Sequence, residues 1–106
     1  MVLTTLADEA TAKTFIEELV EDRVVACGTI VRATSIFRWE GSVTGEREVL
    51  VLLKTRRARW ADLEAAVKRR HPYSVPELLA LPVEAGLDAY LNWVDQETTN
   101  TGTALP

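Results

Sequence analysis

The sequence predicts one α+β domain of the ferredoxin-like βαββαβ class, followed by a short C-terminal helix. The chain has 106 residues, the length of one domain. Short runs rich in β-branched residues alternate with stretches whose apolar residues recur at helical spacing. Their order is strand, helix, strand, strand, helix, strand, and this order is typical of the ferredoxin-like fold.

The first half of the pattern begins at residues 2–6, whose sequence VLTTL is typical of a short strand. Asp8 follows as a helix N-cap, and Glu9 adds a favourable charge to the first helical turn. The helix is predicted to bury one face, because apolar residues recur at three- and four-residue spacing: Ala12, Phe15, Ile16, Leu19 and Val20.

A β-hairpin is predicted next. Residues 24–39 are rich in β-branched and aromatic side chains, and Gly41 and Gly45 mark a turn. The second strand of the hairpin is predicted over residues 48–55.

The second half contains another amphipathic helix, with Trp60, Leu63 and Val67 on its buried side. It is expected to end near His71, because Pro72 disfavours helical geometry in the residue before it. A strand at 77–83 follows.

Asp88 is expected to cap a final short helix, and residues 98–106 form a predicted flexible polar tail, so that the domain spans 1–97. The inward side chains of that helix are expected to be Leu87, Tyr90, Leu91 and Val94.

Two of the predicted strands are apolar at every position: residues 49–53 and 78–81. A sheet covered by helices on one side should instead alternate apolar and polar residues. The second side of this sheet therefore needs cover, and a chain of this length is too short to supply another layer. The obvious cover is another copy of the chain.

Composition indicates which kinds of partner and which cellular location to expect. The net charge of −4 argues against a nucleic-acid or anionic-membrane partner, and the longest aliphatic run, 49–53, is far shorter than the ~20 residues that span a bilayer. Cys27 is the only cysteine, and no leader-like segment precedes the first strand. These features predict a cytoplasmic protein without an internal disulfide.

Basic residues are concentrated between 54 and 70, and acidic ones between 8 and 22. One interpretation is that the two segments lie side by side in the fold. The other is an anion site, which would be formed by Lys54, Arg56, Arg57 and Arg59.

Five runs of residues resemble, in this order, the CutA family, which is named for divalent cation tolerance: VVACGTI, SIFRWEG, EVLVLLKT, HPYSVPELLALPVEAG and YLNWV. The resemblance implies a ferredoxin-like subunit, a tight homotrimer with sheets facing inward, and a fold related to PII signalling proteins. One departure is visible. Where the family usually has Cys-Val-Asn, this chain has Cys27, Gly28 and Thr29.

The segment HPYSVPE, residues 71–77, holds the only histidine of the chain. Cys27 and His71 are both suited to copper or zinc, and Glu77 could add a carboxylate oxygen. Two soft ligands do not make a structural metal site, and an alternative is that the two prolines make this segment a stiff connector.

The resemblance also implies a crevice between subunits, in which the metal candidates Cys27, His71 and Glu77 would be joined by Trp39, Lys54, Thr55 and Tyr73.

The predicted function is that of a trimeric cytoplasmic binding or regulatory protein of the CutA type, with copper or another divalent metal ion as ligand and no required cofactor. Two alternatives are a PII-related trimer that binds a small anion or metabolite, and an assembly scaffold without a small ligand. An enzyme is not expected, because phosphate loops, nucleophile elbows and paired catalytic carboxylates are absent from the sequence.

Overall fold

The structure is a computed structural model and describes residues 1–99. The elements are β1 (Val2–Leu6), α1 (Glu9–Glu21), β2 (Cys27–Trp39), β3 (Ser42–Lys54), the 3₁₀ turn η1 (Arg57–Arg59), α2 (Trp60–Arg70), β4 (Leu79–Ala80) and α3 (Asp88–Glu97). The four strands form one antiparallel sheet in the order β2-β3-β1-β4. This topology confirms the predicted ferredoxin-like fold.

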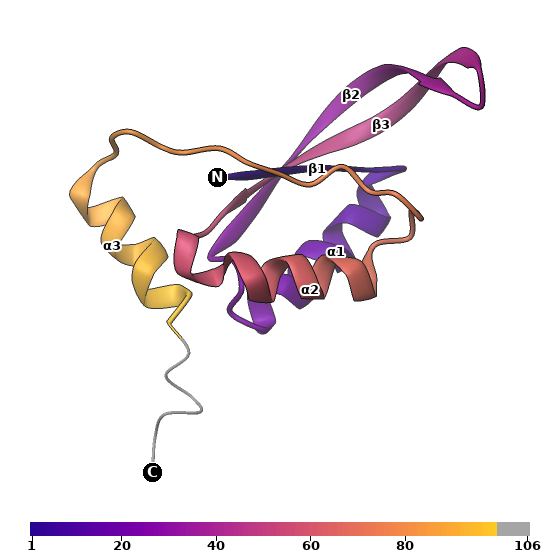
Figure 1. Ribbon diagram of the computed structural model, residues 1–106. Helices are drawn as coiled ribbons and strands as arrows, with labels where there is room; N and C mark the ends of the chain where they lie inside the picture. Colours follow the sequence, from indigo (N-terminus) through magenta and orange to yellow (C-terminus); the bar gives the residue numbers. More distant parts are fainter. Residues whose placement is uncertain (100–106) are drawn as a thin grey trace.

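Helices α1 and α2 lie together on one side of the sheet (Figure 1). The Asp8 carboxylate starts α1 by accepting a hydrogen bond of 2.7 Å from the backbone N–H of Thr11, and this bond lowers the pKa of Asp8. The predicted buried faces are confirmed, except that Val20 is 39% exposed. The residues that the two helices bury are Ala12, Phe15, Ile16, Leu19, Leu63, Ala66 and Val67.

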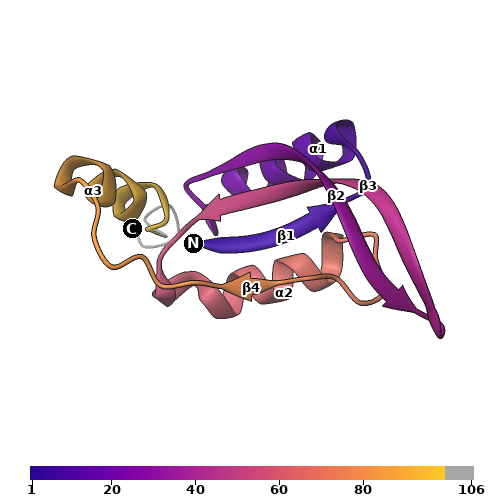
Figure 2. The ribbon, with the colours of Figure 1, turned by 90° about the horizontal axis from the view of Figure 1, so that it is seen from above.

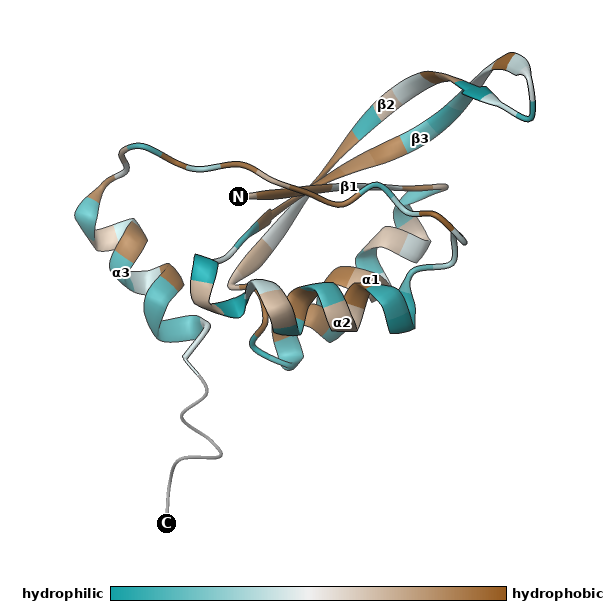
Figure 3. Ribbon diagram, in the orientation of Figure 1, coloured by the Kyte–Doolittle hydropathy of each residue, from teal (hydrophilic) through white to brown (hydrophobic). Residues whose placement is uncertain are grey.

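The core lies between these helices and the inner face of the sheet. Its strand residues come from β1 and from the part of β3 that pairs with β1: Val2, Leu6, Val49, Val51 and Leu53. Figure 3 shows the same concentration of hydrophobic residues along β1 and the neighbouring stretch of β3.

The β2–β3 hairpin is longer than predicted, since β3 begins at Ser42 rather than at residue 48. Glu40 and Gly41 form the two-residue turn with φ of 49° and 82°, the left-handed geometry that tight hairpins require. Gly45 is not part of the turn but lies within the paired strand, opposite Ile36. Most of this hairpin therefore extends beyond the rest of the sheet (Figure 1).

The last strand is shorter than the predicted 77–83. Only Leu79–Ala80 pair with β1, although Met1 and Leu81 extend the contact by exchanging hydrogen bonds of 2.7 and 3.0 Å. Prolines on both sides of this segment cannot donate to a strand ladder, which explains the short pairing. Figure 2 shows β4 at the edge of the sheet, beside β1.

The C-terminal helix differs from the prediction at both ends. Asp88 is its first residue rather than its cap, and Leu87, at the cap position, makes no side-chain hydrogen bond to the helix. The predicted tail began at residue 98, yet Thr98 is fully buried and accepts a 2.9 Å hydrogen bond from Arg56. Residue 98 belongs to the folded domain. The remainder of the predicted tail, 100–106, lies outside the described residues.

Candidate functional site

Polar side chains gather where β2 begins and β3 ends. Cys27 and Lys54 are direct partners across the two strands. The Lys54 ammonium donates a 2.5 Å hydrogen bond to the Thr29 hydroxyl, and the Cys27 thiol lies 3.5 Å from the Tyr90 phenol of α3. We call Cys27, Thr29, Lys54 and Tyr90 the Cys27 corner.

The Cys27 corner combines a soft sulfur atom with a positive charge and two hydroxyl groups. The hydrogen bond between Tyr90 and Cys27, together with partial burial, raises the pKa of Tyr90 above its ordinary value. The Trp93 ring packs beside the Tyr90 ring, with 5.7 Å between the ring centres. A thiolate suits copper or zinc, whereas the ammonium suits an anion.

Thr55 lies next to the Cys27 corner, but its hydroxyl is used in a hydrogen bond that holds the fold together. Its hydroxyl donates a 2.7 Å hydrogen bond to the carbonyl of Val24, in the connection between α1 and β2. The structure thus brings three of the predicted site residues together: Cys27, Lys54 and Thr55.

His71 lies elsewhere, in a buried position at the end of α2. Its Nε2 is 2.9 Å from the carbonyl oxygen of Thr5, and its Nδ1 accepts a 3.1 Å hydrogen bond from the N–H of Tyr73. The carbonyl can only accept, so Nε2 carries the proton and both ring nitrogens have a partner. A metal ion at either nitrogen would have to displace one of these bonds.

Burial lowers the pKa of His71 and outweighs the hydrogen bond to the Thr5 carbonyl and the charge of Glu48, which act in the opposite direction. The ring packs edge-on against Phe15, with 5.5 Å between the ring centres. His71 is therefore a neutral core residue at physiological pH.

Tyr73 joins His71 to the sheet. Its ring lies 4.9 Å from the imidazole, and its hydroxyl donates a 2.6 Å hydrogen bond to the Glu48 carboxylate. Burial, followed by the bond to Glu48, raises the pKa of Tyr73. The pair fixes the segment after α2 against β3.

The remaining two candidates, Trp39 and Glu77, are not part of the Cys27 corner. Trp39 is at the tip of the hairpin, twelve residues along β2 from Cys27, which corresponds to roughly 40 Å of extended strand. Glu77 is exposed just before β4. Within residues 1–99, no three or more His, Cys, Asp or Glu side chains are grouped so that they could hold a metal ion. One subunit alone does not assemble the predicted metal set.

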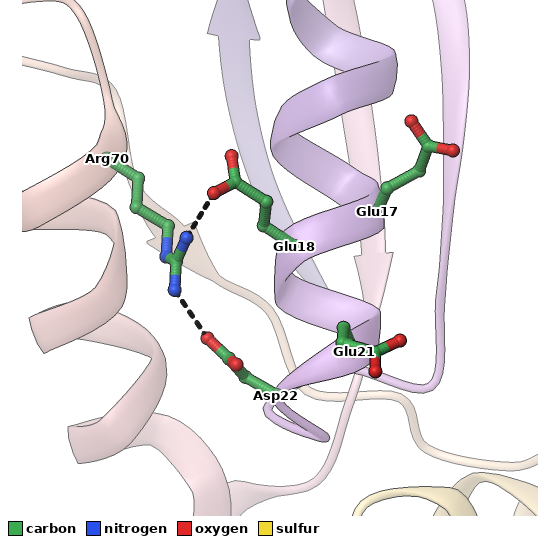
Figure 4. Close-up of a pocket in the computed structure, with 5 residues that line it drawn as sticks. All are labelled: Glu17, Glu18, Glu21, Asp22 and Arg70. Atoms are coloured by element: carbon green, nitrogen blue, oxygen red, sulfur yellow. Dashed lines mark hydrogen bonds and ion pairs between the residues drawn. The ribbon is translucent and has the colours of Figure 1, made fainter.

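A shallow hollow between α1 and α2 is lined by acidic side chains and Arg70 (Figure 4). The Arg70 guanidinium binds both Glu18 and, at 2.7 Å, Asp22. Glu17 and Glu21 point away from this pair in Figure 4. The hollow is an ion-paired contact between the helices, and it confirms that part of the basic segment lies beside the acidic one.

Two residues that take part in these contacts, Tyr90 and Glu48, were not predicted from the sequence. Helical spacing placed Tyr90 in the core, but 43% of it is exposed, and its hydroxyl meets Cys27. Glu48 falls within a predicted strand, and its bond to Tyr73 joins residues 25 positions apart. No local signal in the sequence indicates either contact.

The element order, the strand order and the one-sided helices define a ferredoxin-like α+β subunit. Comparison with known proteins then makes the assignment specific. The chain belongs to the family of CutA1 divalent ion tolerance proteins, which matches residues 1–97. The predicted resemblance is confirmed.

Relatives from distant organisms share most of the chain. The divalent-cation tolerance protein CutA of Thermus thermophilus is 43% identical over 92% of this chain and 96% of its own length. Protein CutA of Mus musculus is 42% identical over 96% of this chain, which spans 60% of the mouse protein. The solved structure of the periplasmic divalent cation tolerance protein CutA from Archaeoglobus fulgidus is 31% identical, with a TM-score of 0.89 over 92% of this chain and 96% of that one.

Proposed function

We propose that the protein is a homotrimeric binding protein for divalent cations, with ligand sites in the crevices between subunits. The observation that carries this proposal is the apolar outer face of the sheet, on the side away from α1 and α2. Leu3 pairs with Leu52 on one side and with Leu79 on the other, and these three side chains share the outer face. The next row along the sheet adds Leu50 and Val31.

This outer face has no helix over it in the described part of the chain (Figure 1). Val31 and Leu79 are 46% and 55% exposed. Contiguous apolar patches of this kind mark protein contacts, and burial of each large aliphatic side chain contributes about 1.5–3 kcal/mol. A second and a third copy of the chain, with their sheets facing inward, would bury this face.

The Cys27 corner borders the same face. Cys27 and Thr29 alternate along β2 with residues of the inner face, and so they point to the same side as Val31. In a trimer they would lie at the margin of the subunit contact. We propose that Cys27 supplies one soft ligand to a copper or other divalent ion and that the neighbouring subunit supplies the rest, since residues 1–99 of one chain hold no complete set.

A second candidate function rests on Lys54. Its ammonium, held by Thr29 at the rim of the outer face, would suit a small anion or metabolite. This is the PII-like alternative, and it uses the same corner with a different ligand. The third alternative, a scaffold without a small ligand, is supported only if neither ligand class binds.

The other parts of the proposal follow from the sequence. We propose that the protein has no catalytic role and no resident cofactor, and that it acts in the cytoplasm, although the Archaeoglobus relative is described as periplasmic. Within residues 1–99 no helix is both long enough and apolar enough to cross a bilayer.

Isothermal titration of the purified trimer with copper and zinc salts tests the metal assignment. We expect Cys27→Ser to weaken metal binding by about tenfold or more, which is the loss of roughly 1.4 kcal/mol. Lys54→Met is the matched control, because it changes the same corner without removing the thiol.

Titration with inorganic pyrophosphate separates the second candidate. Binding that Lys54→Met abolishes and Cys27→Ser preserves would favour the anion function over the metal function. If neither metal nor pyrophosphate binds the trimer, the scaffold alternative is the better account.

A further inference from the structure

The connector between α2 and β4, residues 72–78, is fastened to the domain at one residue. It contains two prolines, which have no N–H to donate. In the part of the chain that the structure describes, its hydrogen bonds both come from Tyr73. The N–H donates to Nδ1 of His71 at 3.1 Å, and the hydroxyl donates to the Glu48 carboxylate at 2.6 Å. Figure 2 shows the connector turning back from α2 to the edge of the sheet.

His71 is held on its other side by the body of the domain. Its Nε2 lies 2.9 Å from the Thr5 carbonyl and 3.2 Å from the Thr4 hydroxyl, and its ring packs edge-on against Phe15 of α1. Only 8% of His71 is exposed in a single chain, so its burial does not depend on other copies. Because both ring nitrogens have partners within the chain, His71 is not among the ligands that we propose for the metal ion.

One additional proton changes this arrangement. In the neutral ring, Nε2 donates to the Thr5 carbonyl and Nδ1 accepts from the N–H of Tyr73. The additional proton would occupy Nδ1, and two N–H groups would then face each other across 3.1 Å. The ring cannot turn away without losing its contacts with Thr5 and Phe15, whereas the Tyr73 backbone belongs to a loosely bonded connector. The connector is therefore the side that moves.

Charged groups near the imidazole come from several elements. The charge of Glu48, in β3, favours protonation of His71, but burial has the larger effect and lowers its pKa. Glu46, also in β3, and Asp8, before α1, act together with Glu48 on the neighbouring phenol. Arg70 of α2 precedes the histidine, and its guanidinium is bonded to carboxylates of α1. The ring is thus neutral, and the connector is fastened, at physiological pH.

We propose that His71 is a proton-sensitive latch: its neutral form holds residues 72–78 against the sheet, and its protonated form releases them. The change from acceptor to donor at Nδ1 carries this inference, because the sheet side of the ring donates in both forms. Release would loosen the chain where it enters β4, which begins at Leu79. A stiff connector that merely contains a buried histidine would open only together with the whole domain. The inference rests neither on the metal site nor on the assembly.

NMR spectroscopy of the whole protein, freed of metal by a chelator, tests the proposal. His71 is the only histidine of the chain, so its ring signals report its protonation directly. The second observable is the protection factor of the Tyr73 amide, which compares its exchange rate with that of an unfolded peptide at the same pH. As the pH falls from about 6.5 through the titration of the ring, we expect this protection to fall at least about tenfold, while amides of α1 keep theirs.

His71→Gln removes the titrating group and should make the protection of the Tyr73 amide independent of pH over this range. Glu48→Gln keeps an acceptor for the Tyr73 hydroxyl but removes the charge that favours protonation, so the ring should titrate, and the amide should open, at lower pH. This variant also tests the latch if His71→Gln does not fold. Glu77→Gln is the matched control and should leave both transitions unchanged, because the carboxylate charge that acts on His71 is that of Glu48.

Three results would overturn the proposal. The Tyr73 amide could keep its protection while the ring titrates, which would separate the connector from the proton. Amides of α1 could lose protection at the same pH, which would mean that the whole domain opens. The ring could also stay neutral down to about pH 4, where a latch of this kind would have no use.

Discussion

His71 holds the segment after α2 against the sheet through both ring nitrogens. The sequence suggested His71 as a metal ligand because imidazole is a common one. It did not reveal that two backbone groups, the Thr5 carbonyl and the Tyr73 N–H, already form hydrogen bonds with the ring nitrogens. The resemblance implied that Lys54 and Cys27 share a crevice, and the structure makes them direct partners across the β2–β3 hairpin. Contacts made by local pairing were predictable, whereas those that depend on how loops cross the sheet were not.

The buried imidazole predicts a dependence of stability on pH. Burial lowers the pKa of His71 below the ordinary value of 6.5, so the neutral ring contributes fully to the free energy of unfolding above that pH. This contribution is lost as the pH falls through the lower pKa of the folded state. The melting temperature should therefore fall between about pH 6.5 and pH 5 more steeply in the parent protein than in His71→Gln, which cannot gain the proton. Equal slopes in the two proteins would assign the effect to carboxylates.

Gly28 lies close against Ile16, with no room for a side chain of its own. A Cβ atom at this position would lie 2.9 Å from Cγ2 of Ile16, too close for an ordinary contact. We expect Gly28→Val to cost about 1–3 kcal/mol of unfolding free energy through overpacking. The cost should shrink when Ile16→Ala provides space, and chemical denaturation of the four proteins of this cycle would measure the coupling. Additive costs would show that Ile16 is not the obstacle.

At the scale of the elements, α3 is fastened to the domain by its C-terminal end. Val94 and Thr98 are buried, and Arg56 donates to both the hydroxyl and the carbonyl oxygen of Thr98. The helix itself was predictable from its spacing, but its buried face was not: of the four side chains expected to point inward, Val94 is buried, whereas Leu87, Tyr90 and Leu91 are 75%, 43% and 40% exposed. Its anchor was not predictable either, because polar composition alone suggested that residue 98 starts a tail.

Replacing Thr98 by Val should destabilise the docking of α3. The change leaves the Arg56 guanidinium without one acceptor in a partly buried position, at a cost of about 1–3 kcal/mol. Amide hydrogen exchange in α3 should accelerate accordingly. Thr99→Val is the control, since within residues 1–99 the Thr99 hydroxyl bonds to the carbonyl of Asp95 in the same helix. Equal exchange in both variants would contradict an anchoring role for Thr98.

At the scale of the whole molecule, the outer face of the sheet explains why two strand segments lack the expected alternation. One set of their residues fills the core, as Val51 and Leu53 do, while Leu50 and Leu52 remain half-buried on the other face. The sequence was sufficient to predict that this face needs cover. The sequence could not show which of the predicted site residues lie together within one chain and which would need a neighbouring copy. That depends on how the chain folds.

If assembly and folding are coupled, stability must depend on protein concentration. The melting temperature should fall on dilution of about a hundredfold, because mass action favours dissociation of the trimer. Differential scanning fluorimetry at both concentrations would measure the shift. A melting temperature that is independent of concentration would indicate that the subunit folds without help from its neighbours.

The most direct test of the account is the mass of the protein in solution, measured by light scattering for the parent and two matched variants. Leu52→Lys places a charge on the outer face of the sheet, and Val20→Lys places the same charge on the helical side, where Val20 is already 39% exposed. A buried unpaired charge costs several kcal/mol, so we predict a mass near three times 11.8 kDa for the parent and Val20→Lys, and a smaller mass for Leu52→Lys. A parent protein with the mass of one chain, or a Leu52→Lys variant that assembles like the parent, would contradict assembly through this face.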